Sequence, residues 1–189
     1  MSRRPNPERK VALLNQVVAY MKENGLADLT LRPLASALET SPRNLLYHFR
    51  SSSELITASL EAIAREDTKD FEEAFGDLKA SSVSDLVSRF ASFFDDHKES
   101  IRIYVELASM QLTNAEELGD YLSRLTGPWY DLIARTLEKL DMESTRAHDL
   151  ATLIVGVMWG RYLTSAGDPL GQGPLRAQGM VTALSALVD

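Results

Sequence analysis

The sequence predicts an all-α protein: a three-helix helix-turn-helix head followed by a larger helical body, with about nine helices in all. Apolar residues recur at helical spacing along the whole chain, and no segment alternates as a strand does. Helix start signals are dense in the first 60 residues. Charge is also divided, because residues 1–50 carry eight basic and four acidic side chains, a net +4, which leaves −11 for the rest.

Composition excludes several classes of protein. The 189 residues include no cysteine, which rules out disulfides, thiolate metal sites and cysteine nucleophiles. The three histidines match no metal-ligand spacing, and no nucleophile triad or glycine-rich nucleotide loop is present, so we expect no enzyme, metal or cofactor. The longest apolar run, residues 150–160, is too short to span a bilayer. We therefore expect no membrane partner and, by default, a cytoplasmic protein.

The first helix is predicted to start at Asn6-Pro7. The Asn6 side chain can accept an unpaired backbone N–H, and Pro7 suits the first helical position because it has no N–H. Gly25 is a natural stop, since glycine adopts positive φ at little cost. The apolar face between them is predicted to consist of Val11, Leu14, Val18 and Met21.

Two short helices then follow in close succession. Thr30 is predicted to cap one that ends near Leu38, and Ser41-Pro42 repeats the cap-plus-proline signal for another that runs to Phe49. This is the layout of a helix-turn-helix, in which the first helix braces the second. Ser51 and Glu54 have capping-box spacing and predict a fourth helix toward Phe75.

The rest of the chain is predicted to be helical over residues 82–95, 99–112, 115–140, 144–166 and 175–188. Gly127-Pro128 is expected to kink or split the helix over 115–140, because proline removes a helix hydrogen bond. We expect a DNA-binding head over residues 1–52, extending to about 65 with the start of the fourth helix, and a body over residues 53–189 that binds an effector and dimerises.

The leading end of the helix that starts at Ser41 presents Pro42, Arg43 and Asn44. In a helix-turn-helix these positions meet base edges in the major groove. Arg43 can donate to guanine O6 and N7, and Asn44 can pair with adenine. Two alternatives stay open: either side chain could bind phosphate, which fixes position without reading sequence, or could be a solvated surface residue.

The run Gly25-Leu26-Ala27-Asp28-Leu29-Thr30 through Leu34-Ala35, then Ser41, Leu46-Tyr47-His48-Phe49 and Leu55, resembles the signature of the TetR family of transcriptional regulators over roughly residues 7–65. The resemblance implies a ligand-responsive repressor. It implies DNA contacts, at phosphates or base edges, from Thr30, Arg32, Ser41, Pro42, Arg43, Asn44, Tyr47, His48 and Arg50. It implies a helix-turn-helix core of Leu34, Ala35, Leu38, Leu46 and Phe49.

The chain departs from that signature at two positions. Glu39 stands where the family usually has the turn glycine, so it must either tolerate positive φ or alter the turn, at a cost of roughly 1 kcal/mol. Ser52 replaces a lysine that usually contacts phosphate. That contact is absent unless Arg50 or the Arg3-Arg4 arm substitutes for it.

The resemblance also implies that the last two helices pair with a second copy. The predicted homodimer surface comprises Leu153, Ile154, Val157, Gly160, Val181, Leu184 and Leu187, with burial inside one chain as the alternative. A pocket for an unidentified small effector is expected among Phe71, Phe90, Phe94, Tyr104, Glu106, Trp129, Tyr130 and Trp159, although most large side chains there are expected to be ordinary core. Candidate polar anchors are Arg102, Glu106, Gln111 and Arg161.

Two-fold symmetry of such a dimer predicts a pseudo-palindromic DNA operator, read at half-sites about 34 Å apart. The main rival is a helical interaction or small-ligand carrier module that has lost DNA binding, because Glu39 and Ser52 both depart toward weaker binding. Steep loss of affinity with rising salt would distinguish a DNA binder from a carrier.

Overall fold

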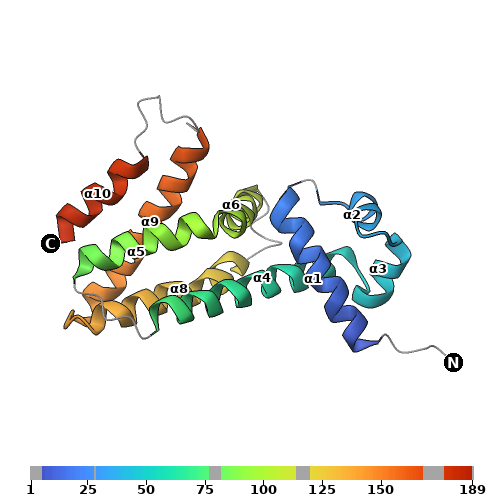
Figure 1. The fold of residues 1–189 in the computed structure, drawn as a ribbon, viewed down its shortest axis with the longest axis horizontal. Helices are drawn as coiled ribbons and strands as arrows, with labels where there is room; N and C mark the ends of the chain where they lie inside the picture. The colour runs from blue at the N-terminus through green and yellow to red at the C-terminus, as the bar shows by residue number, and fades with distance from the viewer. Residues whose placement is uncertain (1–5, 28, 77–81, 114–119, 168–176, 189) are drawn as a thin grey trace. The chain divides into compact units, whose positions relative to one another are not determined.

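The structure, a computed structural model, describes residues 6–27, 29–76, 82–113, 120–167 and 177–188. Nine helices and no strand occur in these residues (Figure 1), so the predicted all-α class is confirmed. The helices are α1 (Pro7–Asn24), α2 (Leu31–Ala37), α3 (Pro42–Phe49), α4 (Ser52–Phe75), α5 (Val83–Asp96), α6 (Lys98–Thr113), α8 (Tyr121–Glu138), α9 (Ser144–Gly167) and α10 (Ala177–Val188).

The chain divides into two compact units, and each draws on separate stretches of sequence. Unit 1 consists of Met1–Asp67 and Arg102–Leu125, and unit 2 of Thr68–Ile101 and Thr126–Asp189. The helices α4, α6 and α8 therefore each contribute to both units. The functional division at residue 52 stays a prediction, because it concerns roles rather than compactness.

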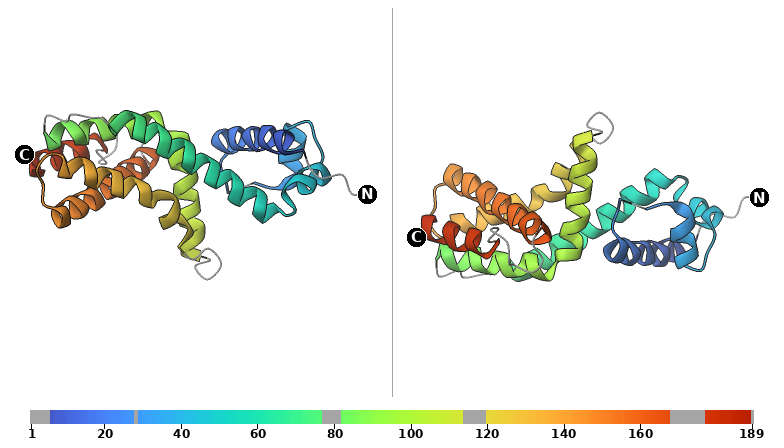
Figure 2. Two further views of the ribbon diagram at one scale, coloured as in Figure 1. Left: turned by 90° about the horizontal axis from the view of Figure 1, so that it is seen from below. Right: turned by 90° about the horizontal axis from the view of Figure 1, so that it is seen from above.

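In unit 1, α1 and α4 run in the same direction. Lys10 Nζ lies 3.2 Å from a Glu54 carboxylate oxygen, and Lys22 Nζ lies 2.8 Å from one of Glu66, both across 44 residues of sequence. The first pair joins the start of α1 to the start of α4, and the second joins the end of α1 to a later turn of α4, so the two helices point the same general way and lie beside each other in Figure 2. Both lysines and both glutamates are partly exposed, so these pairs fix direction more than they add stability.

The buried face of α1 differs from the predicted one. Leu13, Val17, Val18 and Met21 are buried, whereas Val11 is 57% exposed and Leu14 is only half-buried. Val17 and Met21, one helical turn apart, are completely enclosed. The prediction is confirmed for Val18 and Met21 and wrong for Val11 and Leu14, because α1 carries apolar residues on two faces and spacing alone could not tell which face meets the rest of unit 1.

Most predicted helix starts are confirmed. Asn6 Oδ1 accepts from Glu8 N at 2.9 Å, and Ser51 Oγ accepts from Glu54 N at 3.0 Å. Thr30 occupies the N-cap position of α2, but its side chain accepts no hydrogen bond from the described first turn. Thr30 therefore occupies the N-cap position without capping α2 through its side chain, and the residue is exposed.

The turn between α2 and α3 places Glu39 at a φ of 48°, as the missing glycine predicted. Its backbone N–H donates to Ser36 O at 3.2 Å, and Thr40 N donates to Ala35 O at 2.9 Å. The turn therefore keeps its hydrogen bonds, and the β-carbon of Glu39 is held in the left-handed region that glycine occupies more cheaply.

We expect Glu39→Gly to raise the free energy of unfolding by about 0.5 to 1 kcal/mol, because it removes this backbone strain. Denaturant unfolding measures the effect. Ser36→Gly, at an exposed position inside α2, is the matched control and should lower stability by a similar amount. A Glu39→Gly protein as destabilised as Ser36→Gly would contradict the assignment of strain.

Unit 2 is built around α5, with α10 packed against both α5 and α9. A cluster of four rings, Phe71, Phe75, Phe90 and Phe93, joins the end of α4 to α5, with Phe75 and Phe90 stacked at 4.4 Å between centroids. The helix α8 continues through Pro128, so of the predicted kink or split the split does not occur. It starts at Tyr121, and residues 114–119 of the predicted range lie outside the described residues.

Searches of the described residues give two further findings. No helix there has the length and apolar character needed to cross a membrane. No group of three or more His, Asp or Glu side chains in that part of the chain is placed to hold a metal ion.

Candidate nucleic-acid interface

The leading end of α3 projects charged and polar side chains. Ser41 Oγ accepts from Asn44 N at 3.1 Å and starts the helix as predicted. Arg43 and Arg50 are exposed, and Tyr47, one turn after Arg43, is 45% exposed. Arg43 and Tyr47 therefore share one open face of α3, where both can reach a bound duplex.

Asn44 is less available than Arg43. Its Nδ2 donates to Thr40 Oγ1 at 2.9 Å, which holds the amide against the turn, and the side chain is half-buried. The predicted adenine contact by Asn44 would have to use Oδ1 and the second Nδ2 hydrogen while this bond orients the amide. The Arg43 side chain makes no such hydrogen bond within the described residues. It is therefore the better placed of the two residues predicted to contact bases.

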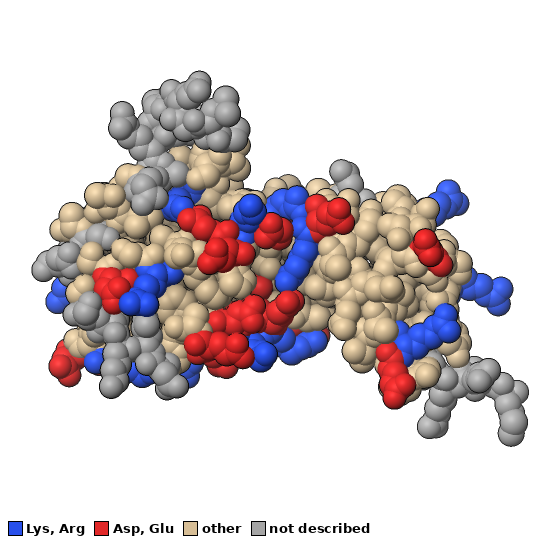
Figure 3. Space-filling model, in the orientation of Figure 1, with Lys and Arg blue, Asp and Glu red and all other residues tan. Residues whose placement is uncertain are grey.

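The cations of this surface form no ion pair within the described residues. Among the described residues, no carboxylate lies within ion-pair distance of Arg32, Arg43 or Arg50. Over the face drawn in Figure 3, Lys and Arg side chains are interspersed with Asp and Glu. Cations without a carboxylate partner are available to phosphate oxygens, and binding there would release counterions.

His48 and Leu46 do not lie where they were predicted. His48 is 5% exposed, stacks edge-on against Tyr47 and has a buried Nδ1, so it belongs to the packing beneath α3 rather than to the exposed set. Leu46 is half-buried, as is Leu38, whereas Leu45 is completely enclosed. Leu34, Ala35 and Phe49 are buried, as predicted. Leu45 is thus the core residue that the predicted set lacked.

Two side chains of α6 hold the chain at the end of α1. Glu106 Oε2 accepts hydrogen bonds from Leu26 N and from Ala27 N, the latter at 3.1 Å. Arg102 Nη2 donates to Lys22 O at 2.8 Å, and its Nε lies 3.9 Å from Glu106. Arg102 and Glu106 thus form a clamp on the C-terminal end of α1 and the following loop.

Gly25 makes the clamp possible. Its φ of 85° and ψ of −174° lie in a region that only glycine occupies readily. A β-carbon there would lie 2.7 Å and 2.9 Å from the two carboxylate oxygens of Glu106. The glycine that ends α1 as predicted therefore also allows Glu106 to approach the loop.

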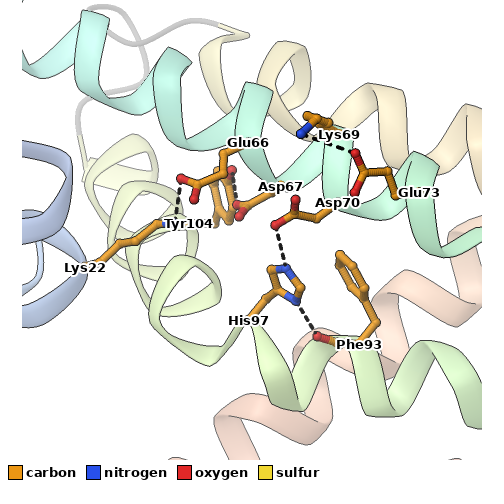
Figure 4. A network of polar contacts seen from close by, with 9 residues as sticks. All are labelled: Lys22, Glu66, Asp67, Lys69, Asp70, Glu73, Phe93, His97 and Tyr104. Carbon is orange, nitrogen blue, oxygen red and sulfur yellow. Dashed lines mark hydrogen bonds and ion pairs between the residues drawn. The ribbon is translucent and has the colours of Figure 1, made fainter. Parts of the chain in front are cut away.

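Figure 4 shows further polar contacts on the unit 1 part of α4. Besides the Lys22–Glu66 pair, Tyr104 Oη donates to Asp67 Oδ2 at 2.9 Å, and both residues are buried. Burial, reinforced by the Asp67 charge, raises the pKa of Tyr104 far above its ordinary value. The Tyr104 hydroxyl therefore stays protonated and donates its hydrogen bond to Asp67. In unit 2, His97 Nε2 lies 3.3 Å from Asp70 Oδ2.

Comparisons with known proteins give a match at the level of structure. No protein-family model matches the sequence, and the search of curated proteins finds no match. A TetR transcriptional regulator from Legionella pneumophila superposes with a TM-score of 0.73 at 14% identity, covering 98% of each chain. Salmonella enterica GusR gives 0.69 at 18% identity over 97% of each chain. A TetR-family member from Streptomyces coelicolor A3 gives 0.63 at 18%, covering 97% of this chain and 99% of that one.

The chain has the TetR fold. The matches cover nearly the whole chain, so the TetR fold extends well beyond the 7–65 stretch whose residues suggested it. The prediction from sequence is confirmed at this level. The role of each predicted site residue depends on the contacts that its side chain makes in this structure.

The predicted effector residues divide into several environments. Phe71 and Phe90 lie inside the ring cluster of unit 2, and Tyr104 is bonded to Asp67 in unit 1, so these three are packed core. Glu106 belongs to the clamp on α1. Packing and hydrogen bonds within the chain already engage these four residues. The effector contact expected of them, like that of the others, stays a prediction.

The remaining predicted residues all belong to unit 2. Phe94 and Trp129 are buried and meet edge to face at 6.2 Å between centroids. Tyr130 and Trp159 are half-buried and share a hydrogen bond, which partly offsets the rise that burial causes in the pKa of Tyr130. Phe94 also lines an open hollow, and therefore a ligand could reach it.

The predicted dimer surface divides in a similar way. Ile154, Val181 and Leu184 are buried within one chain, so for them the alternative holds. Leu153 is 48% exposed, and Val157 and Gly160 are partly exposed on the same helix. Met180 and Leu163 are further exposed apolar residues that the prediction did not include. The side chain of Leu187 lies outside the described residues, as does the Arg3-Arg4 arm.

Sequence reasoning also missed the clamp. Arg102 and Glu106 stand four residues apart on α6, a spacing that places them on one face and could have indicated a pair. Nothing in the sequence marks the partner, because Leu26 and Ala27 take part through their backbones and lie about 80 residues away.

Proposed function

We propose that the protein is a sequence-specific DNA-binding transcriptional regulator of the cytoplasm. The observation that carries this proposal is the open face of α3, where Arg43 and Tyr47 project and no described carboxylate neutralises the arginines. The rigid support beneath that face favours recognition, since Leu45 and Phe49 are fully enclosed. The TetR fold is consistent with the same function, because neighbours of that fold include transcriptional regulators.

The proposal includes a homodimer. The exposed apolar residues Leu153, Leu163 and Met180 of α9 and α10 form the surface we assign to the second copy. Gly156 on α9 has open space beside it and permits close approach of a helix there, whereas Gly160 already lies against Met180 of its own chain. Two copies related by a two-fold axis would present two α3 helices to half-sites about 34 Å apart. The operator is accordingly pseudo-palindromic.

The proposal also includes release by a small effector. An effector changes DNA binding only through its different affinity for the two states of the protein. Phe94, Trp129, Tyr130 and Trp159 remain the candidates for contact with it. EbrR, a multidrug-binding protein whose structure holds imidazole, has a similar fold with a TM-score of 0.63.

Selection of bound sites from random DNA, followed by gel shifts over a salt series, tests the proposal. A regulator should enrich a two-fold-related site and lose affinity steeply as salt rises. A small-ligand carrier, which the departures at Glu39 and Ser52 would favour, should enrich no site. Failure to retain any DNA at low ionic strength would overturn the proposal in favour of that carrier.

A further inference from the structure

A small hollow in unit 2 lies between α5, the first residue of α6 and α9, and it combines an apolar wall with two cations. Its volume is about 260 Å³, and its lining includes Phe94, Asp95, Lys98, Met158, Arg161 and Tyr162. Arg161 and Tyr162 lie one turn after Met158, so one face of α9 supplies all three. The hollow is smaller than the pockets that hold drug-sized molecules.

Arg161 is the unusual group of this hollow. Its side chain is 14% exposed, and its Nη2 donates to Asp95 Oδ2 at 2.6 Å. Its Nε is buried and has no hydrogen-bond partner in the described part of the chain. Buried donors in proteins normally have acceptors, so an acceptor brought to this guanidinium would gain a bond that the chain itself does not supply.

The net charge of the side chains that line the hollow favours binding of one anion. Lys98 and Arg161 stand against the single carboxylate of Asp95, which is 59% exposed and therefore partly solvated. Among the side chains that line the hollow, the excess is one positive charge. A planar carboxylate suits a guanidinium that still has free N–H groups, because two oxygens can meet two donors.

We propose that this hollow binds a small organic carboxylate with an aromatic or branched apolar body. The carboxylate lies against Arg161 and Lys98, and the apolar body lies against Phe94 and Met158. Binding itself does not depend on DNA. That such a compound is the effector rests on the function proposed above, and it narrows that effector to a chemical class.

Calorimetric titration of 3-phenylpropanoate into the full-length protein without DNA tests the proposal, with 3-phenylpropanamide as the uncharged match. We expect the acid to bind at least tenfold more tightly than the amide. Asp95→Asn should strengthen binding of the acid several-fold, because it removes the carboxylate that competes for Arg161. Arg161→Gln should abolish the preference for the acid, and Arg135→Gln, at an exposed site of α8 in unit 2, should leave it unchanged.

Equal binding of acid and amide would overturn the proposal, as would no binding of either or an Asp95→Asn protein that binds the acid no more tightly. The Asp95 variant keeps the test valid even if Arg161→Gln fails to fold. If the acid binds and the protein retains no DNA, the ligand site stands and the regulator function fails. If the protein selects an operator but shows no preference for the acid, the reverse holds.

Discussion

Replacing Arg43 by alanine is expected to weaken binding to the selected operator by roughly 5- to 150-fold, which corresponds to about 1 to 3 kcal/mol. Arg43 is exposed at the leading end of α3, and no described carboxylate competes for it. If it donates to a guanine, the loss should disappear in operators already mutated at one base pair. Gel shifts or fluorescence anisotropy on single-base operator variants measure this pattern.

Tyr47→Phe is the comparison within the same face, and it should weaken all DNA sequences alike, since we expect its hydroxyl to meet the backbone. Arg135→Ala removes one positive charge from α8 in unit 2 and should change affinity little. If Arg43→Ala instead weakens binding to all DNA sequences equally, and lowers the slope of log affinity against log salt concentration by about one, Arg43 contacts a phosphate. A loss at one base pair for Tyr47→Phe would reverse the two roles.

Replacing Glu106 by alanine is expected to lower the free energy of unfolding by roughly 2 to 4 kcal/mol, because it removes the acceptor of two backbone N–H groups. One of them belongs to Leu26, which is buried and would not regain water. The Arg102 guanidinium would also lose its nearest carboxylate. Denaturant unfolding measures the loss, and hydrogen exchange should show faster exchange at the amides of Leu26 and Ala27.

Two variants on the same helix separate the hydrogen bonds from charge. Glu106→Gln keeps an acceptor oxygen and should cost less than alanine. Glu99→Ala removes an equal charge from an exposed position of α6 and should have little effect. Equal stability of the Glu106→Ala and Glu99→Ala proteins would show that the clamp contributes nothing. Operator affinity should fall with Glu106→Ala if the clamp positions the helix-turn-helix.

Local signals predicted the first 50 residues well. Asn6, Gly25, Ser41 and Ser51 start or end helices for reasons that lie within a few residues, and the positive φ of Glu39 could be expected from the turn. The same kind of signal placed Arg43 at the open end of α3. These features are predictable because neighbouring residues decide them.

Features decided by distant packing were not predictable. Spacing along α1 fits Val11 and Leu14 as well as Leu13 and Val17, and only contact with the rest of unit 1 selects the second pair. The family resemblance implied a DNA contact for His48, but packing buries its side chain. In the body, the sequence pattern around Ile154 is the same whether its side chain packs against a second copy or against its own chain. Burial depends on the tertiary partner, and the sequence does not name that partner.

The discontinuous make-up of unit 1 has a consequence for biosynthesis. The loop after α1 is held by Arg102 and Glu106, which leave the ribosome about 80 residues later. At ordinary elongation rates this delay is on the order of 4 to 16 seconds. During that interval a nascent chain would carry the helix-turn-helix without its final support, so the part that contacts DNA should reach full rigidity only after half of the polypeptide has emerged.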